Sequence, residues 1–156
     1  MTEHADRLGL PWDFRAWTTP GQLIQWIAED VDKLDWTSPA LAEVTRSRPD
    51  FRPQVMLRLL IYSYATGLYE SDEIVNACYG DPTLRALCEH RAPTAKEMVA
   101  FRRENRELLA AFLVQLFKRA LRLKCGEFPV SAGLKKVLGE LAAARIDIAR
   151  HMDAAA

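Results

Sequence analysis

The segment from Pro53 to Gly67, PQVMLRLLIYSYATG, is apolar on every side when it is wound as an α-helix. Proline in the first turn and glycine just after the last turn are common limits of a helix. A helix without a polar face must be covered on all sides by other elements. The segment therefore predicts a central helix inside a helical bundle, with Arg58 reaching solvent along its stem.

Helix start signals recur along the rest of the chain, whereas strand-like alternation is nearly absent. Further helices are predicted to begin after Thr19, Ser38, Ser71, Asp81 and Thr94, and a last one to run from about Ala132 to Met152. The fold class that follows is all-α, a compact bundle of six to seven helices with a helix-turn-helix-like corner. We expect an N-terminal arm over residues 1–18, a helical domain over 19–124, and a C-terminal amphipathic helix over 125–156, packed on the core or extending from it.

The formal net charge of zero hides a division along the chain. Residues 1–45 carry a net charge of −5 and residues 46–124 a net charge of +5. A basic centre beside an acidic start fits a polyanionic partner, and it also fits two parts of one chain that attract each other. The charge pattern alone leaves both interpretations open.

The lack of recognisable targeting features and the use of cysteine both indicate the cytoplasm. No apolar run approaches the length of a membrane span, and the start MTEHADRLGL lacks the features of a secretory signal. Three cysteines without a CxxC pair indicate reduced thiols. We therefore expect a cytoplasmic protein without a membrane partner.

The predicted helix from Thr94 to about Lys124 has a basic side and an apolar side. One sector of this helix is basic and contains Lys96, Arg103 and Arg106, with Arg102 beside it. The opposite sector is apolar and contains Met98, Phe101, Leu108, Phe112 and Leu116. A short helix and a tight turn precede this helix, which is the layout of a helix-turn-helix DNA reader. An ordinary solvated helix face, with Arg103 and Glu107 paired, is the alternative interpretation.

Several features of the chain resemble the N-terminal domain of bacterial insertion-sequence transposases of the InsH type. The features are the proline-led apolar helix LLIYSYATG, a short helix opened by a serine, and a proline-led turn into FRRENRELLAAFLVQLF. Upstream, DVDKLDW is similar to the segment that precedes this domain. The resemblance covers roughly residues 30–121.

The resemblance implies DNA as a partner. In that family the helical domain is thought to help recognise transposon ends and assemble the enzyme. By this resemblance the DNA-contact residues are Lys96, Arg102, Arg103 and Arg106, with Arg91 and Arg85 at the turn as phosphate contacts. The partners implied are duplex DNA, an intact transposase and a second copy of the chain.

In the same family the domain precedes an RNase H-like core with a DDE carboxylate triad and divalent metal. Here Asp147, in ARIDIARHM, is the sole acid near the place of the first catalytic aspartate, and the chain ends soon afterwards. Phosphoryl chemistry with two metals needs several converging carboxylates. We therefore expect no enzyme activity, no cofactor, no metal and no small-molecule substrate.

A second function class stays open from the sequence. The chain can be a helical protein–protein interaction or oligomerisation module that has lost DNA binding. In that case the acidic first helix or the apolar side of the last helix, with Leu138 and Leu141, would mediate self-association.

Overall fold

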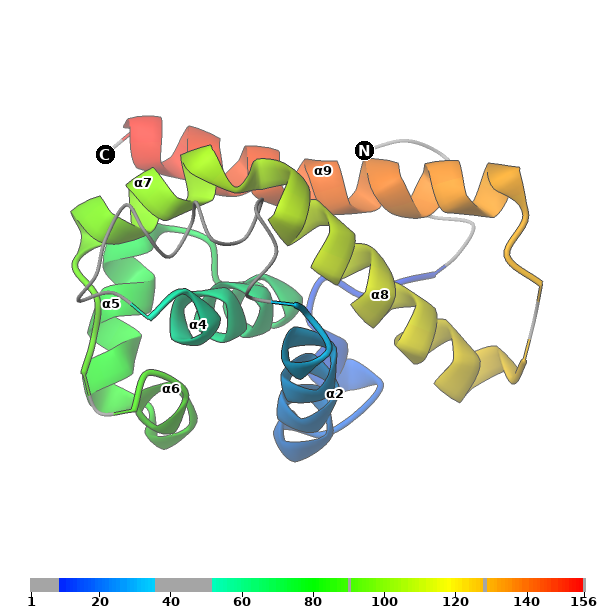
Figure 1. Cartoon of the computed structure of the whole chain (residues 1–156), viewed down its shortest axis with the longest axis horizontal. Coiled ribbons are helices and arrows are strands. Elements are labelled where there is room, and N and C mark those ends of the chain that lie inside the picture. Colours follow the sequence, from blue (N-terminus) through cyan, green and yellow to red (C-terminus); the bar gives the residue numbers. More distant parts are fainter. Residues whose placement is uncertain (1–8, 36–51, 90, 128, 156) are drawn as a thin grey trace.

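The structure is a computed structural model that describes residues 9–35, 52–89, 91–127 and 129–155. It confirms the all-α prediction: these residues form helices and no strand. The elements in chain order are η1 (Phe14–Ala16), α2 (Pro20–Asp32), α4 (Pro53–Ala65), α5 (Ser71–Gly80), α6 (Pro82–Leu87), α7 (Ala95–Glu104), α8 (Arg106–Cys125) and α9 (Ala132–Ala155). Figure 1 shows their arrangement. The helix predicted after Ser38 lies outside the described residues.

Helix α4 is the central helix that its sequence predicts. Its side chains are buried on all sides, and Leu57, Leu59 and Leu60 have no exposed surface. The helix stops at a glycine in the left-handed conformation, Gly67, with φ of 84°. The amide of Leu68 then donates to the carbonyl of Ser63 at 2.8 Å, which closes the end of the helix.

Ion pairs between α2 and its neighbours explain part of the charge division along the chain. Arg119 of α8 contacts Glu29 at 3.1 Å and Asp30 at 2.9 Å. Arg58 of α4 contacts Asp32 at 3.1 Å. The acidic first helix is therefore paired with basic residues of the same bundle, as the second interpretation of the charge pattern had it.

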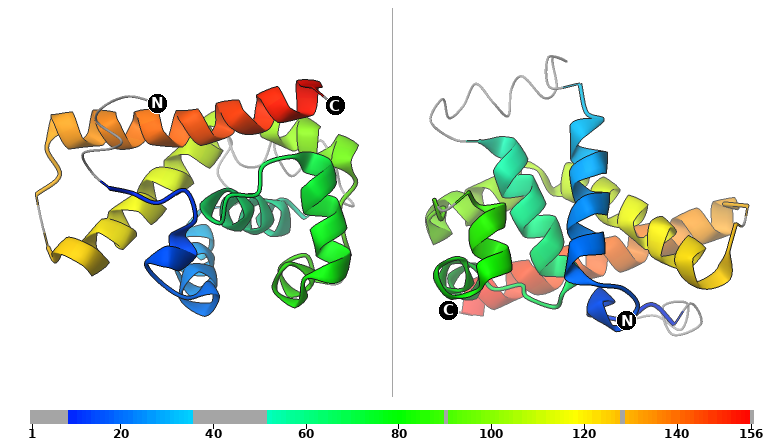
Figure 2. Two further views of the ribbon diagram at one scale, coloured as in Figure 1. Left: turned by 180° about the vertical axis from the view of Figure 1, so that it is seen from behind. Right: turned by 90° about the horizontal axis from the view of Figure 1, so that it is seen from below.

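Helix α9 runs along one side of the molecule, crossing α8 and reaching α7 and α5 with its C-terminal half (Figures 1 and 2). Its apolar side packs into the core: Leu138 has no exposed surface and Leu141 is 6% exposed. The prediction that these two leucines mediate self-association is therefore wrong, because they are already covered by the chain itself.

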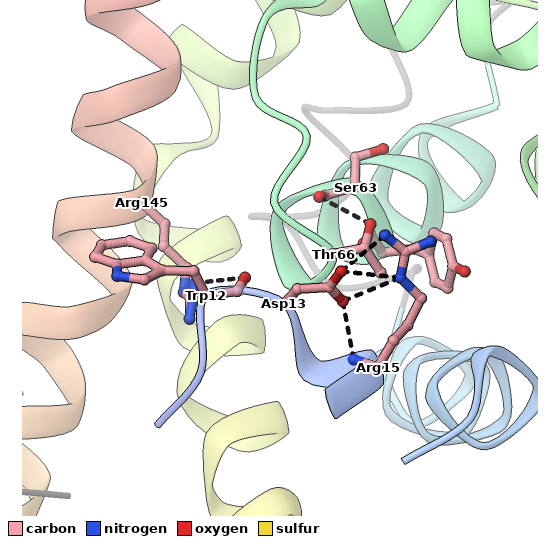
Figure 3. A network of polar contacts seen from close by, with 7 residues as sticks. Trp12, Asp13, Arg15, Ser63, Thr66 and Arg145 are labelled. Carbon is pink, nitrogen blue, oxygen red and sulfur yellow. Dashed lines mark hydrogen bonds and ion pairs between the residues drawn. The ribbon is translucent and has the colours of Figure 1, made fainter. Parts of the chain in front are cut away.

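Arg145, in the middle of α9, anchors the segment that leads into η1 (Figure 3). Its guanidinium lies 4.7 Å from the ring centre of Trp12 and 5.0 Å from that of Phe117, and it donates to the carbonyl of Pro11 at 2.7 Å. Burial lowers the pKa of Arg145, since among the described residues no carboxylate pairs with it. Aromatic faces and carbonyl oxygens thus hold this buried charge.

Replacing Leu60 with alanine is expected to lower the free energy of unfolding by about 2–5 kcal/mol, because the side chain is enclosed and its removal leaves a cavity. Urea denaturation measures the change. Leu123→Ala is the matched control, since Leu123 is 54% exposed and its loss should cost less than about 0.5 kcal/mol. Equal effects of the two changes would contradict the central position of α4.

Candidate nucleic-acid interface

Helix α7 begins with the predicted capping box. The amide of Glu97 donates to Oγ1 of Thr94 at 3.1 Å, and the amide of Thr94 donates to Oε1 of Glu97 at 3.1 Å. These two bonds satisfy backbone donors that the helix start leaves open. Lys96 is exposed in this first turn.

The prediction of one uninterrupted helix from Thr94 to Lys124 is wrong, because the helix breaks at Asn105. This residue has φ of −124° and ψ of 32°, and its side-chain amide donates to the carbonyl of Phe101 at 3.0 Å. Asparagine competes for backbone groups in this way and so favours helix ends. The break also changes the buried side of α8, where Leu109 rather than Leu108 is fully enclosed.

Arg102 does not project to solvent with the other basic residues, and the expectation that it does is wrong. The residue is 4% exposed. Its guanidinium forms an ion pair with Asp153 of α9 and donates to Oγ of Ser71 at 3.3 Å. The C-terminal half of α9 runs beside α7 (Figure 1), and its Asp153 supplies the partner that holds Arg102 inside.

Ser71 was predicted to cap α5, and this prediction is also wrong. The helix starts at Ser71 itself, and the residue before it, Glu70, gives no side-chain cap. Instead the carboxylate of Asp153 accepts from the amide of Ser71 at 2.9 Å and from its hydroxyl at 2.7 Å. A carboxylate at a helix N-terminus is favoured by the helix dipole, so Asp153 takes the role of the cap from another helix.

The pKa values of this network follow from burial and hydrogen bonding. Burial alone would raise the pKa of Asp153, but hydrogen bonds from Ser71 and Arg102 hold it below its ordinary value. Burial disfavours the charged form of Arg102, yet nearby Tyr64 and Asp153 raise its pKa. Burial raises the pKa of Tyr64 to about 12. At neutral pH the Arg102–Asp153 pair is therefore fully ionised.

Next to this pair, four arginines from three helices line one pocket of about 350 Å³. Arg102 and Arg103 come from α7, Arg106 from α8, and Arg150 from α9, where Asp153 adds a carboxylate. Its apolar walls are Val99 and Ile146. The pocket thus unites three of the residues predicted to contact DNA with one, Arg150, that sequence reasoning missed.

One of the three remaining arginines is paired with a carboxylate, and the other two are not. Arg106 contacts the carboxylate of Asp147 at 2.5 Å, and both side chains are 42% exposed. Arg103 and Arg150 are exposed and make no ion pair with any residue that the structure describes. The alternative pairing of Arg103 with Glu107 is therefore not formed.

Arg85 and Arg91 are not brought to this pocket. Arg85 of α6 donates to the carbonyl of Tyr79 at the end of α5. Arg91 lines a separate pocket of about 190 Å³ that also includes Arg52, Glu89 and Glu97. Of the six predicted contact residues, three thus line the first pocket, Arg91 lines the second, and Lys96 and Arg85 line neither.

Two further observations concern the residues that the structure describes. Among them, no group of three or more histidine, cysteine or acidic side chains is placed to hold a metal ion. None of the helices formed by the same residues combines the length and the apolar character that crossing a membrane requires.

Comparison with models of known protein families gave a match. A model of the family described as a transposase domain (DUF772) matches residues 13–104, which is more than half of the chain and ends with α7. The chain belongs to this transposase-domain family. Comparisons with curated proteins and with solved structures gave no match.

Replacing Asp153 with asparagine is expected to lower the free energy of unfolding by about 3 kcal/mol, because it leaves a buried guanidinium without its counter-charge. Asp147→Asn is the matched control: it makes the same change on the same helix, but in an exposed pair whose loss should cost less than about 1 kcal/mol.

The difference between the wild type and Asp153→Asn should also depend on pH. Because the folded pKa of Asp153 lies below its ordinary value of 3.8, the carboxylate stabilises the fold above that value, and this contribution is lost as the pH falls through the folded pKa. Urea denaturation at several pH values measures both effects. A gap that stays constant as the pH falls from neutral to below the folded pKa of Asp153 would contradict the assigned pair.

Proposed function

We propose that this chain is a non-catalytic, transposase-derived domain that binds duplex DNA. The observation that carries the proposal is the convergence of four guanidinium groups from α7, α8 and α9 on one pocket. The planar fork of arginine matches phosphate oxygens in pairs, and phosphate contacts supply most of the affinity of such domains for DNA. Membership in a transposase-domain family agrees with this partner.

The proposed contact residues are Lys96, Arg103, Arg106 and Arg150. Lys96 and Arg103 are exposed and two helical turns apart on α7, about 10 Å along its axis, so they extend the basic surface beyond the pocket. Arg106 contacts Asp147 through one guanidinium nitrogen, Nη2, so its other N–H groups can donate to a phosphate while that pair persists.

Arg102 has a different proposed role from the one its sequence position predicts. Held by Asp153 and Ser71, it forms the floor of the pocket and stays in its buried site, with its charge balanced by Asp153. We leave Arg85 and Arg91 out of the contact set, because one donates to a backbone carbonyl and the other lies near Glu89 and Glu97.

The non-catalytic part of the proposal rests on the carboxylates. Asp147 is the acid nearest to the place of the family's first catalytic aspartate, and it lies on a helix, paired with Arg106. Two-metal phosphoryl chemistry needs several converging carboxylates, and among the described residues no group of three or more acidic, histidine or cysteine side chains is placed to hold a metal ion. A role as a DNA-binding regulator of an intact transposase fits such a domain.

An oligomerisation module, the other function class, has less support. The apolar residues Leu23, Ile27 and Val31 of α2 are buried in the bundle, as are Leu138 and Leu141 of α9. Neither helix keeps these side chains for a second copy.

The double variant Arg103→Gln/Arg106→Gln is expected to bind duplex DNA at least about tenfold more weakly at ~0.1 M salt. Each lost phosphate contact should also lower the slope of log affinity against log salt concentration by about 1. Fluorescence anisotropy with a labelled duplex at several salt concentrations measures both quantities.

The matched control is Lys135→Gln/Lys136→Gln, which removes the same charge from exposed positions at the start of α9. Lys136 lies about 21 Å along the helix from Arg150, so this variant should retain most of the affinity. An absence of DNA binding by the wild type at low salt, or an equal loss in both double variants, would overturn the proposal.

A further inference from the structure

We call the pocket lined by Arg102, Arg103, Arg106 and Arg150 the arginine pocket. We infer that it binds a phosphate monoester, the terminal phosphate of a DNA strand, in preference to the phosphodiesters within a duplex. The inference rests on the proposed function, because it names the part of the DNA that enters the pocket. It is carried by the charge balance of the lining residues, by the buried floor of the pocket and by its recessed form.

The charge balance leaves two positive charges for a ligand. Asp153 neutralises Arg102, and Asp147 neutralises Arg106. Arg103 and Arg150 have no carboxylate partner among the described residues, and both line the pocket. A phosphate monoester carries close to two negative charges at pH 7, whereas a phosphodiester carries one. The monoester therefore matches the remaining charge.

The floor of the pocket is fixed before a ligand arrives. The Arg102 side chain is 5% exposed, and its guanidinium is held by Asp153 and by Ser71. A guanidinium that is already ordered loses little conformational freedom on binding, so its contribution to affinity is larger than that of a mobile surface side chain. Such a floor is a property of a binding site rather than of a merely solvated basic face.

The shape of the pocket favours the end of a strand. Arg102, Arg103, Arg106 and Arg150 surround a volume of about 350 Å³ between α7, α8 and α9. A phosphate within a duplex is flanked by sugars on both sides, which restricts how far it can enter a recess between helices. A terminal phosphate has one such neighbour and three non-bridging oxygen atoms that can face several guanidinium groups at once.

Helix α9 completes this site. Its Arg150 supplies one of the two uncompensated charges, and its Asp153 fixes the floor. Both residues lie beyond the segment that the family model matches, which ends at residue 104. The inferred specificity for strand ends is therefore a property of the docked C-terminal helix.

The test compares two blunt duplexes of identical sequence, one with 5′-phosphates and one with 5′-hydroxyls, by fluorescence anisotropy. The wild type is expected to bind the phosphorylated duplex about tenfold more tightly, as charge-assisted hydrogen bonds from two arginines would give. Arg150→Gln should abolish this preference, whereas the control Lys136→Gln should retain it. Both positions are exposed, and circular dichroism verifies that the variants fold.

Inorganic phosphate distinguishes a strand end from a free anion as the source. If the pocket selects strand ends, millimolar phosphate should reduce the preference only modestly relative to sodium chloride of equal ionic strength. If phosphate at that concentration removes the preference completely, the site is one for free phosphate and the assignment to strand ends is wrong.

The outcomes separate the two proposals. Equal affinity of the wild type for the two duplexes overturns the inference and leaves DNA binding in place. A preference that survives in Arg150→Gln also overturns it, because the terminal phosphate is then bound elsewhere. If neither duplex binds, the proposed function fails, and the inference fails with it.

Discussion

The arrangement of the candidate site depends on the contacts that the carboxylate of Asp153 makes with Ser71 and Arg102. This carboxylate accepts two hydrogen bonds from Ser71 at the start of α5 and pairs with Arg102 of α7, so one side chain joins three helices. Because this contact lies near the end of α9, it fixes the whole C-terminal half of that helix against α7. The positions of Arg150 and Asp147 relative to Arg106 follow from it.

The middle of helix α9 is held by cation–π contacts and hydrogen bonds to backbone carbonyls rather than by an ion pair. Arg145 is enclosed by the rings of Trp12, Phe14 and Phe117 and donates to backbone carbonyls of the segment before η1. One helix thus connects the start of the described chain to the helices of the candidate site. The family model ends with α7, yet the buried core and the arginine pocket both include residues of α8 and α9. The physical unit is therefore larger than the matched segment.

Local signals in the sequence predicted what depends on near neighbours. The limits of α4 at Pro53 and Gly67 and the capping box of Thr94 and Glu97 are properties of a few adjacent residues, and the structure confirms them. A helical wheel assumes that the helix is straight. The break at Asn105, whose side chain bonds to Phe101, violates that assumption, and the wheel then places Leu108 rather than Leu109 in the core, although Phe112 and Leu116 are buried as predicted.

The candidate site itself was less predictable, because its partners are distant in the chain. Arg102 looks like a surface residue on the wheel, and its partner Asp153 follows 51 residues later on another helix. Ser71 has the type and place of a cap, but a carboxylate 82 residues away provides that function. No local pattern reveals how α9 packs, so Arg150 could not be assigned to the site. Arg103 and Arg106, predicted from one helix face and the next turn, do line the pocket, whereas Lys96 does not, and contact of these residues with DNA stays a prediction.

The most direct test of this account is to map duplex DNA onto the protein through the arginine side-chain and backbone amide signals in nuclear magnetic resonance spectra. The account predicts that the largest changes occur at Arg103, Arg106 and Arg150, with smaller changes at Lys96. The signals of Arg145 and of the aromatic rings around it should remain in place. Changes concentrated on α2 or around Arg52 and Arg91, with the arginine pocket unaffected, would contradict it.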